Sequence, residues 1–171
     1  MNQVTKIAVA TTLSLGTLLG ATAGASAIHA DAHAATEQQT PYYTYNGLFN
    51  FKGNKALEDK NFYRALQHDN FKYEGLKVGQ STFADVKKAV GNDVKKYYEE
   101  KGVTYYEKND VIFGIDSEGK LVNMTLLIEK INHSDKSVRD HVKQGEIYDA
   151  KTTHVAFYSG NSIVIKAKES R

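Results

Sequence analysis

The fold is decided by residues 103–128, whose sequence is VTYYEKNDVIFGIDSEGKLVNMTLLI. Three runs rich in β-branched and aromatic residues, 103–107, 111–115 and 121–128, are separated by short polar segments. Such runs, bounded by turn-forming residues, are typical of strands joined by tight hairpins, so the stretch predicts an antiparallel meander. The polar segment 116–120 carries carboxylates but lacks the further ligands of a calcium loop, and we interpret it as a hairpin turn.

The sequence after the meander predicts one more helix and one more hairpin. Ser134 can cap a short helix over 135–144. Two β-rich runs, 152–158 and 162–167, then flank Gly160-Asn161, which is a turn signal. We expect this C-terminal hairpin to complete the sheet.

Two short helices are predicted before the meander. Asn54 can cap a helix that runs to about His68 with one apolar side. Ser81 or Thr82 can cap a second helix, which Gly91 would end. The whole pattern predicts one small α+β domain, with an antiparallel sheet built from the meander and the C-terminal hairpin and with two or three short helices.

The first 34 residues predict a signal peptide. Lys6 precedes an uncharged stretch, 7–27, which is followed by small-residue cleavage sites. We favour cleavage between Ala34 and Ala35, with earlier sites at 25–27 and 30–32 as alternatives, and a retained membrane anchor as the other interpretation. The mature chain, 35–171, would then be a single secreted domain, loosely attached to the cell surface at most and without stable membrane insertion.

Composition excludes several kinds of function. The chain has no cysteine, which excludes disulfides, thiol catalysis and cysteine-ligated metals. Its histidines match no metal-ligand spacing, and no phosphate-binding glycine loop or nucleophile elbow is present. We therefore expect a binding protein without catalytic activity, cofactor or metal. The net charge is only +2, and residues 120–171 carry the excess, with nine basic and six acidic side chains.

The chain has eleven tyrosines, and some of them could form a binding platform. Residues 40–47, TPYYTYNG, predict a short edge strand opened by Pro41. In a strand, Tyr43 and Tyr45 share one face and Tyr42 takes the other. These rings either pack on the core or offer a surface for bases or sugars.

Lysines form two pairs with the same local sequence, DVKK, at 85–88 and 93–96. If the helix ran through Gly91, all four lysines would lie on one side as a basic ridge; otherwise they belong to an ordinary solvated surface. The chain also ends in basic residues. The candidate phosphate contacts are Lys87, Lys88, Lys95, Lys96, Lys166, Lys168 and Arg171.

Three stretches, 40–47, 57–62 (LEDKNF) and 85–96 (DVKKAVGNDVKK), resemble the immunodominant staphylococcal antigen B family. The chain is similar to a divergent member, and no counterpart is placed for 131–171. The resemblance implies a secreted or surface-associated antigen that binds extracellular DNA or RNA with little sequence preference and has a virulence-related role at the host interface. It makes the tyrosines of 40–47 and the paired lysines candidate contacts.

A capped helix followed by a meander also resembles small modules of exported β-lactamase inhibitor proteins and outer-membrane assembly lipoproteins. That likeness is architectural and does not fix function. It supports an alternative, a protein-binding module that acts as an inhibitor or as an adhesin for host proteins. Salt separates the two hypotheses, because phosphate contacts weaken steeply with ionic strength and a tyrosine-centred protein interface does not.

Overall fold

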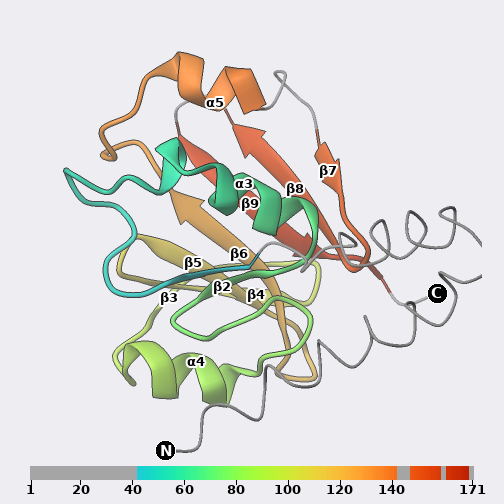
Figure 1. Cartoon of the computed structure of the whole chain (residues 1–171). Helices are drawn as coiled ribbons and strands as arrows, with labels where there is room; N and C mark the ends of the chain where they lie inside the picture. The colour runs from blue at the N-terminus through green and yellow to red at the C-terminus, as the bar shows by residue number, and fades with distance from the viewer. Residues whose placement is uncertain (1–41, 142–146, 159–160, 170–171) are drawn as a thin grey trace, which may run out of the picture. The chain divides into compact units, whose positions relative to one another are not determined.

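An antiparallel sheet of seven strands dominates the computed structural model, which describes residues 42–141, 147–158 and 161–169 (Figure 1). The strands lie in the order β3-β4-β5-β6-β9-β8-β7. Their bounds are β3 Lys95–Glu100, β4 Val103–Lys108, β5 Val111–Ile115, β6 Leu121–Leu127, β7 Ile147–Asp149, β8 Thr153–Tyr158 and β9 Ser162–Ala167. The predicted α+β class, the meander (β4-β5-β6) and the C-terminal hairpin (β8-β9) are confirmed, and β9 joins them by pairing with β6.

The sequence patterns predicted neither of the two edge strands of this sheet. β3 has the sequence KKYYEE, and all six of its residues are exposed. β7 has only three residues and pairs with β8. β3 has no buried residue to alternate with its polar ones, and β7 buries Tyr148 but is too short to show a repeated alternation of apolar and polar residues.

Two more strands form a small parallel pair, which an antiparallel prediction did not include. β1 (Tyr43–Tyr45) pairs with β2 (Phe71–Tyr73), and between them lie the 3₁₀ turn η2 (Ala56–Glu58) and the helix α3 (Lys60–Gln67). A crossover of this kind is what parallel neighbours require.

The cap predicted for the first helix was wrong. Asp59 caps α3, where its side chain accepts from the N–H of Asn61. Asn54 is buried and lies just before η2. It fixes the start of η2, since its Oδ1 accepts from the N–H of Ala56 and its Nδ2 donates to the Phe49 carbonyl. The predicted single helix is therefore a 3₁₀ turn followed by an α-helix.

The second helix, α4 (Phe83–Val90), follows the prediction closely. Thr82 and Asp85 form a reciprocal capping box at its start. Gly91 ends it with φ of +98°, a backbone region that glycine adopts without strain. The helix therefore does not continue to Lys95, and the basic ridge of four lysines is not formed.

The third helix, α5 (Asp135–His141), begins after Ser134, whose Oγ accepts from the N–H of Ser137 as predicted. Its predicted end at 144 lies outside the described residues. So do the signal peptide, the cleavage point between Ala34 and Ala35, and Arg171. Within the described ranges, no helix is both long and apolar enough to span a bilayer.

One face of the sheet carries the core. A row of directly opposed residues on that face comprises Tyr106, Phe113, Met124, Ile165, Val155 and Tyr148. Three elements pack on this face through ring contacts: α3 places Tyr63 on Phe157, β2 places Tyr73 beside Phe113, and α4 stacks Phe83 on Tyr106 at 4.3 Å between ring centroids. No described element packs in this way on the opposite face, which we call the open face.

Candidate functional site

One row of polar, aromatic and charged residues on the open face crosses all seven strands. Each member lies directly opposite the next in the register of the sheet. None of them is aliphatic, and Gly114 has no side chain. From β3 to β7 the row is Tyr98, Tyr105, Gly114, Asn123, Lys166, His154 and Asp149. The row therefore leads from an aromatic end on β3 and β4 to a charged end on β9, β8 and β7.

The aromatic end is a stacked pair of tyrosines. The rings of Tyr98 and Tyr105 lie 4.3 Å apart between centroids, with planes inclined by 9°. Tyr105 lies over Gly114, where an added Cβ would come within 2.9 Å of the Tyr105 ring. Burial, followed by the neighbouring Tyr98 and Glu100, raises the pKa of the Tyr105 hydroxyl. Because Gly114 has no side chain, the Tyr105 ring can lie directly on the sheet, and Tyr98 covers the outer side of that ring.

A groove of about 850 Å³ runs over this face from Tyr105 to β9. Lysines and carboxylates both line it, with a small excess of positive charge. The lysines are Lys101, Lys120, Lys151, Lys166 and Lys168, and the carboxylates are Glu100, Asp116, Glu118 and Glu169.

At the charged end of the row, Lys166 is available to a ligand, whereas Lys168, which follows β9, is engaged by Asp149. Lys168 Nζ lies 2.6 Å from Asp149 Oδ1, and this hydrogen bond is the largest cause of the lowered pKa of that carboxyl. His154 Nδ1 lies 3.1 Å from the same oxygen. Lys166 is exposed and makes no ion pair with any described residue, so its ammonium group can meet a ligand in the groove.

The tyrosines predicted as a platform are divided between burial and exposure, on the faces that the strand pattern predicted. Tyr43 and Tyr45 pack on core rings, with Phe62 at 5.5 Å from Tyr43 and Phe49 at 4.8 Å from Tyr45. Burial raises the pKa of Tyr45 to about 12. Tyr42 is 63% exposed, and Lys72 Nζ lies 5.9 Å from its ring centroid. This group lies at β1, away from the groove on the open face.

The outer sides of Tyr43 and Tyr45 nevertheless line a second hollow of about 630 Å³. Phe51 also lines it and is 43% exposed. Two lysines and two carboxylates at its rim balance one another, namely Lys55, Lys60, Glu58 and Asp59. This hollow therefore has an aromatic floor and no excess of positive charge.

The paired lysines of α4 and β3 lie on more than one surface. Lys87 Nζ lies 4.7 Å above the Phe83 ring, and Phe83 stacks on Tyr106, the cross-strand neighbour of Lys96. Lys87 and Lys96 therefore approach one aromatic stack. Lys95 lies opposite Glu107 in the register, on the open face. Lys88 is exposed on α4 and has no ion-pair partner among the described residues.

Sequence reasoning missed the stack and three lysines of the groove: Tyr98, Tyr105, Lys101, Lys120 and Lys151. One signal could have identified the stack. Two Tyr-Tyr pairs, 97–98 and 105–106, flank Lys101-Gly102, which turns with positive φ at both residues. That is the signature of a tight hairpin, and a hairpin brings the pairs together.

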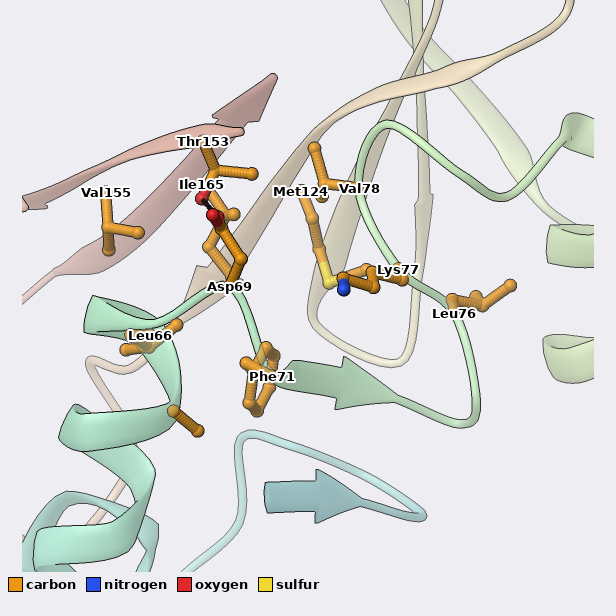
Figure 2. A pocket seen from close by; sticks show the side chains of 11 residues that line it. Leu66, Asp69, Phe71, Leu76, Lys77, Val78, Met124, Thr153, Val155 and Ile165 are labelled. Carbon is orange, nitrogen blue, oxygen red and sulfur yellow. Dashed lines mark hydrogen bonds between the residues drawn. The ribbon is translucent and has the colours of Figure 1, made fainter. Parts of the chain in front are cut away.

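A third cavity, shown in Figure 2, lies inside the core. Its volume is about 20 Å³, which is room for a single water. Its polar lining residues are Asp69, Lys77 and Thr153. Asp69 points at β8, accepts from the Thr152 N–H at 2.7 Å and is hydrogen-bonded to the Thr153 hydroxyl. The cavity is therefore part of the structural core and not a ligand site. No cluster of three metal-ligating side chains occurs in the described part of the chain.

Comparison with known proteins gives one consistent result. The chain is 34% identical over 142 residues to the immunodominant staphylococcal antigen B of Staphylococcus aureus strain USA300, and the match covers 81% of this chain and 68% of the relative. The proteins of the same name from strains NCTC 8325 and bovine RF122 match to the same extent. No family model matches the chain, and no solved structure matches it.

Proposed function

The chain belongs to the immunodominant staphylococcal antigen B family, and from this premise we propose that it is an extracellular antigen that binds nucleic acid, with little sequence preference, on the open face of its sheet. The name of its relatives supports the antigen role. The predicted signal peptide, ending at Ala34, supports export of residues 35–171. The binding requires no catalysis and no cofactor, and the virulence-related role at the host interface belongs to the same proposal.

The observation that carries the binding proposal is that Tyr105, which stacks with Tyr98, lines one groove together with five lysines. Unpaired bases stack on aromatic rings, and each such contact contributes on the order of 1–3 kcal/mol. Lysines attract phosphates without regard to sequence. Tyr105 and Lys166 are three strands apart in one row, which corresponds to about 14 Å at the usual strand spacing. A single-stranded nucleic acid laid across the sheet would meet the aromatic end of the row and then its charged end.

The charge of the groove points to single strands in preference to duplex. Duplex binding without base contacts relies on several focused lysines or arginines. Here five lysines share the groove with four carboxylates. Stacking must therefore supply a substantial share of the free energy of binding, and only unpaired bases present faces to stack.

The test is fluorescence anisotropy of residues 35–171 with labelled random-sequence single-stranded and duplex DNA, each at several salt concentrations. We expect tighter binding to the single strand and a loss of affinity as salt rises. Absence of binding to both DNAs at low salt would overturn the proposal. Equal affinity for both, with a steep salt dependence, would retain nucleic-acid binding but move it from the stack to the lysines.

A protein-binding module is the second candidate, and a separate surface favours it. Near the hollow beside β1, the exposed apolar side chains are Tyr42 at 63%, Leu48 at 53% and Phe51 at 43% exposure. Large exposed apolar side chains beside a hollow with an aromatic lining are typical of protein interfaces. Binding to a host protein through this surface would change little with salt, and Phe51→Ser would weaken it without affecting DNA binding.

A further inference from the structure

The outer edge of β3 is an unpaired strand edge with an unusual order of side chains. Its sequence is KKYYEE, and in the register of the described sheet no strand lies beyond it. Tyr97 and Tyr98 are 62% and 42% exposed. An edge of this kind presents unpaired N–H and C=O groups that can pair with another strand.

A β-bulge sets which face each of these side chains takes. Lys95 and Glu100 are five residues apart, so a regular strand would place them on opposite faces. In this structure Tyr97 is an extra residue between Lys96, opposite Tyr106, and Tyr98, opposite Tyr105. The bulge therefore returns Lys95, Tyr98 and Glu100 to the open face and leaves Lys96 and Glu99 on the other face.

With the bulge, the strand complements its own reversed copy. We propose that β3 pairs antiparallel with β3 of a second copy of the chain, about a two-fold axis that passes beside Tyr98. In that register Lys95 lies opposite the partner's Glu100 on the open face, and Lys96 lies opposite the partner's Glu99 on the other face. Tyr98 lies opposite its own equivalent. The two sheets become one continuous sheet.

Charge selects this register against its neighbours. A slide of two residues in one direction places Glu99 opposite Glu99, and a slide in the other direction places Lys96 opposite Lys96. Like charges directly opposite one another destabilise a strand pair. Within one chain Lys96 Nζ already lies 2.9 Å from Glu99 Oε2, so the dimer joins two such pairs into a network of four charges.

Charged residues and bulges more often keep an edge strand single. Here the same features have the opposite effect toward one partner, because the charges are reversed between the two ends of the strand. Two isolated copies of β3 are repelled in a parallel arrangement and attracted in the antiparallel one. The partner that fits this edge best is therefore the protein itself. This inference does not rest on the proposed nucleic-acid binding.

The test uses the mature chain and two charge variants, Lys95→Glu/Lys96→Glu and Glu99→Lys/Glu100→Lys, in sedimentation velocity over a range of protein concentrations. We expect the native chain to shift from monomer toward dimer as concentration rises, and each variant alone to stay monomeric. An equimolar mixture of the two variants should dimerise again, because every opposed pair then combines a lysine with a glutamate.

The matched control is Lys52→Glu/Lys55→Glu, the same charge change on exposed residues of the loop before η2. It should dimerise like the native chain. A native chain that stays monomeric throughout, or variants that dimerise as the native chain does, would overturn the proposal. Failure of the mixture to dimerise would also overturn this register. Circular dichroism of each variant establishes that it is folded.

Cysteine cross-linking gives a second, independent readout, because the chain has no cysteine of its own. Opposed Cα atoms in an antiparallel pair lie about 4.5–5.5 Å apart, within the range that a disulfide spans. Under mild oxidation Tyr98→Cys should form a covalent dimer much faster than Tyr158→Cys, which replaces an exposed tyrosine of β8. Equal rates for the two variants would contradict the proposed axis.

Discussion

Tyr98 on β3 stacks on Tyr105 on β4 with nearly parallel rings, and Gly114 on β5 lies beneath the Tyr105 ring. The three residues occupy neighbouring strands of one row, so their contact is fixed by the register of the sheet. A ring that is held in place by a glycine below and a second ring above has lost most of its freedom before any ligand arrives. This preorganisation favours stacking of a further planar group on Tyr98, the exposed member of the pair.

Replacing Tyr105 should weaken binding to single-stranded DNA. Tyr105→Leu keeps an apolar side chain over Gly114 but removes the ring that holds Tyr98 in its stacked position, so we expect a loss of about 1–3 kcal/mol of binding free energy, measured by anisotropy. Tyr42→Leu is the matched control, since Tyr42 is exposed at β1 and should not contribute. If Tyr42→Leu reduced affinity and Tyr105→Leu did not, the platform predicted at residues 42–45 would be the site.

Lys166 should contribute to the salt dependence of binding. It is the available cation of the row, whereas Lys168 is held by Asp149. Lys166→Gln should weaken single-stranded DNA binding and reduce the slope of log K against log salt by about 0.7.

Lys88→Gln is the control for this charge change. Lys88 is exposed on α4, and this helix covers the core face of the sheet, on the side opposite to the groove. An unchanged slope for Lys166→Gln would exclude phosphate contact at this position. Point substitution is cleaner here than removal of residues 166–171, since Lys166 is part of β9 and the Lys168 N–H donates to the Thr152 carbonyl.

The packing of the Tyr105 ring on Gly114 should be sensitive to a single added methyl group. In Gly114→Ala the new Cβ would meet Asn123 Cβ at 2.7 Å and the Tyr105 ring at 2.9 Å. Overpacking of this kind destabilises by about 1–3 kcal/mol, which urea denaturation would measure. The ring must also move, so DNA binding should fall together with stability. A variant as stable as the native protein would show that the row relaxes without strain.

Much of the fold could be predicted because its central strands carry their own signal. β5, β6 and β9 are rich in Val, Ile and Leu, and α4 has a capping residue and a terminating glycine. β3 could not be predicted in this way, since KKYYEE contains no β-branched residue and four charges. It is a strand because β4 pairs with it. The parallel pairing of β1 with β2 likewise depends on the crossover through α3 and not on either strand's sequence.

The candidate site was harder to predict than the fold, for a geometric reason. Tyr98, Asn123 and Lys166 are far apart in sequence and meet only through the register of several strands. The lysine pairs at 85–88 and 93–96 have the more visible spacing, but Gly91 breaks the helix that would unite them. Local patterns predicted residue types suited to binding, whereas the surface that combines them is set by non-local pairing.

Asp69 should be important for stability and not for binding. Its carboxylate accepts from the Thr152 N–H and lies in hydrogen-bond contact with the Thr153 hydroxyl, which ties the end of α3 to β8 (Figure 2). Asp69→Ala removes both bonds and places alanine at φ of +58°, so we expect a loss of about 1–3 kcal/mol in urea denaturation. Asp69→Asn keeps an acceptor and tolerates this backbone, and should lose less. Equal losses in the two variants would contradict this assignment.

The capping box of α4 should make part of the stability depend on acid. The Thr82 N–H and then the Thr82 hydroxyl lower the pKa of Asp85. A carboxylate whose pKa is lower in the folded state stabilises the protein above its unfolded pKa of about 3.9, and this contribution is lost as pH falls through the folded value. In Asp85→Asn we therefore expect lower stability than the native chain at neutral pH and a difference that shrinks below about pH 4.

Thr82→Ser is the control for the capping box, because it keeps a hydroxyl and should retain the native pH dependence. Urea denaturation from neutral pH to about pH 3 measures all three proteins over the range in which Asp85 titrates. Lys168 and Lys108 similarly lower the pKa values of Asp149 and Asp93, so the native chain itself should lose stability in this range. A constant difference between Asp85→Asn and the native chain at every pH would show that the capping box acts through hydrogen-bond geometry and not through the charge of Asp85.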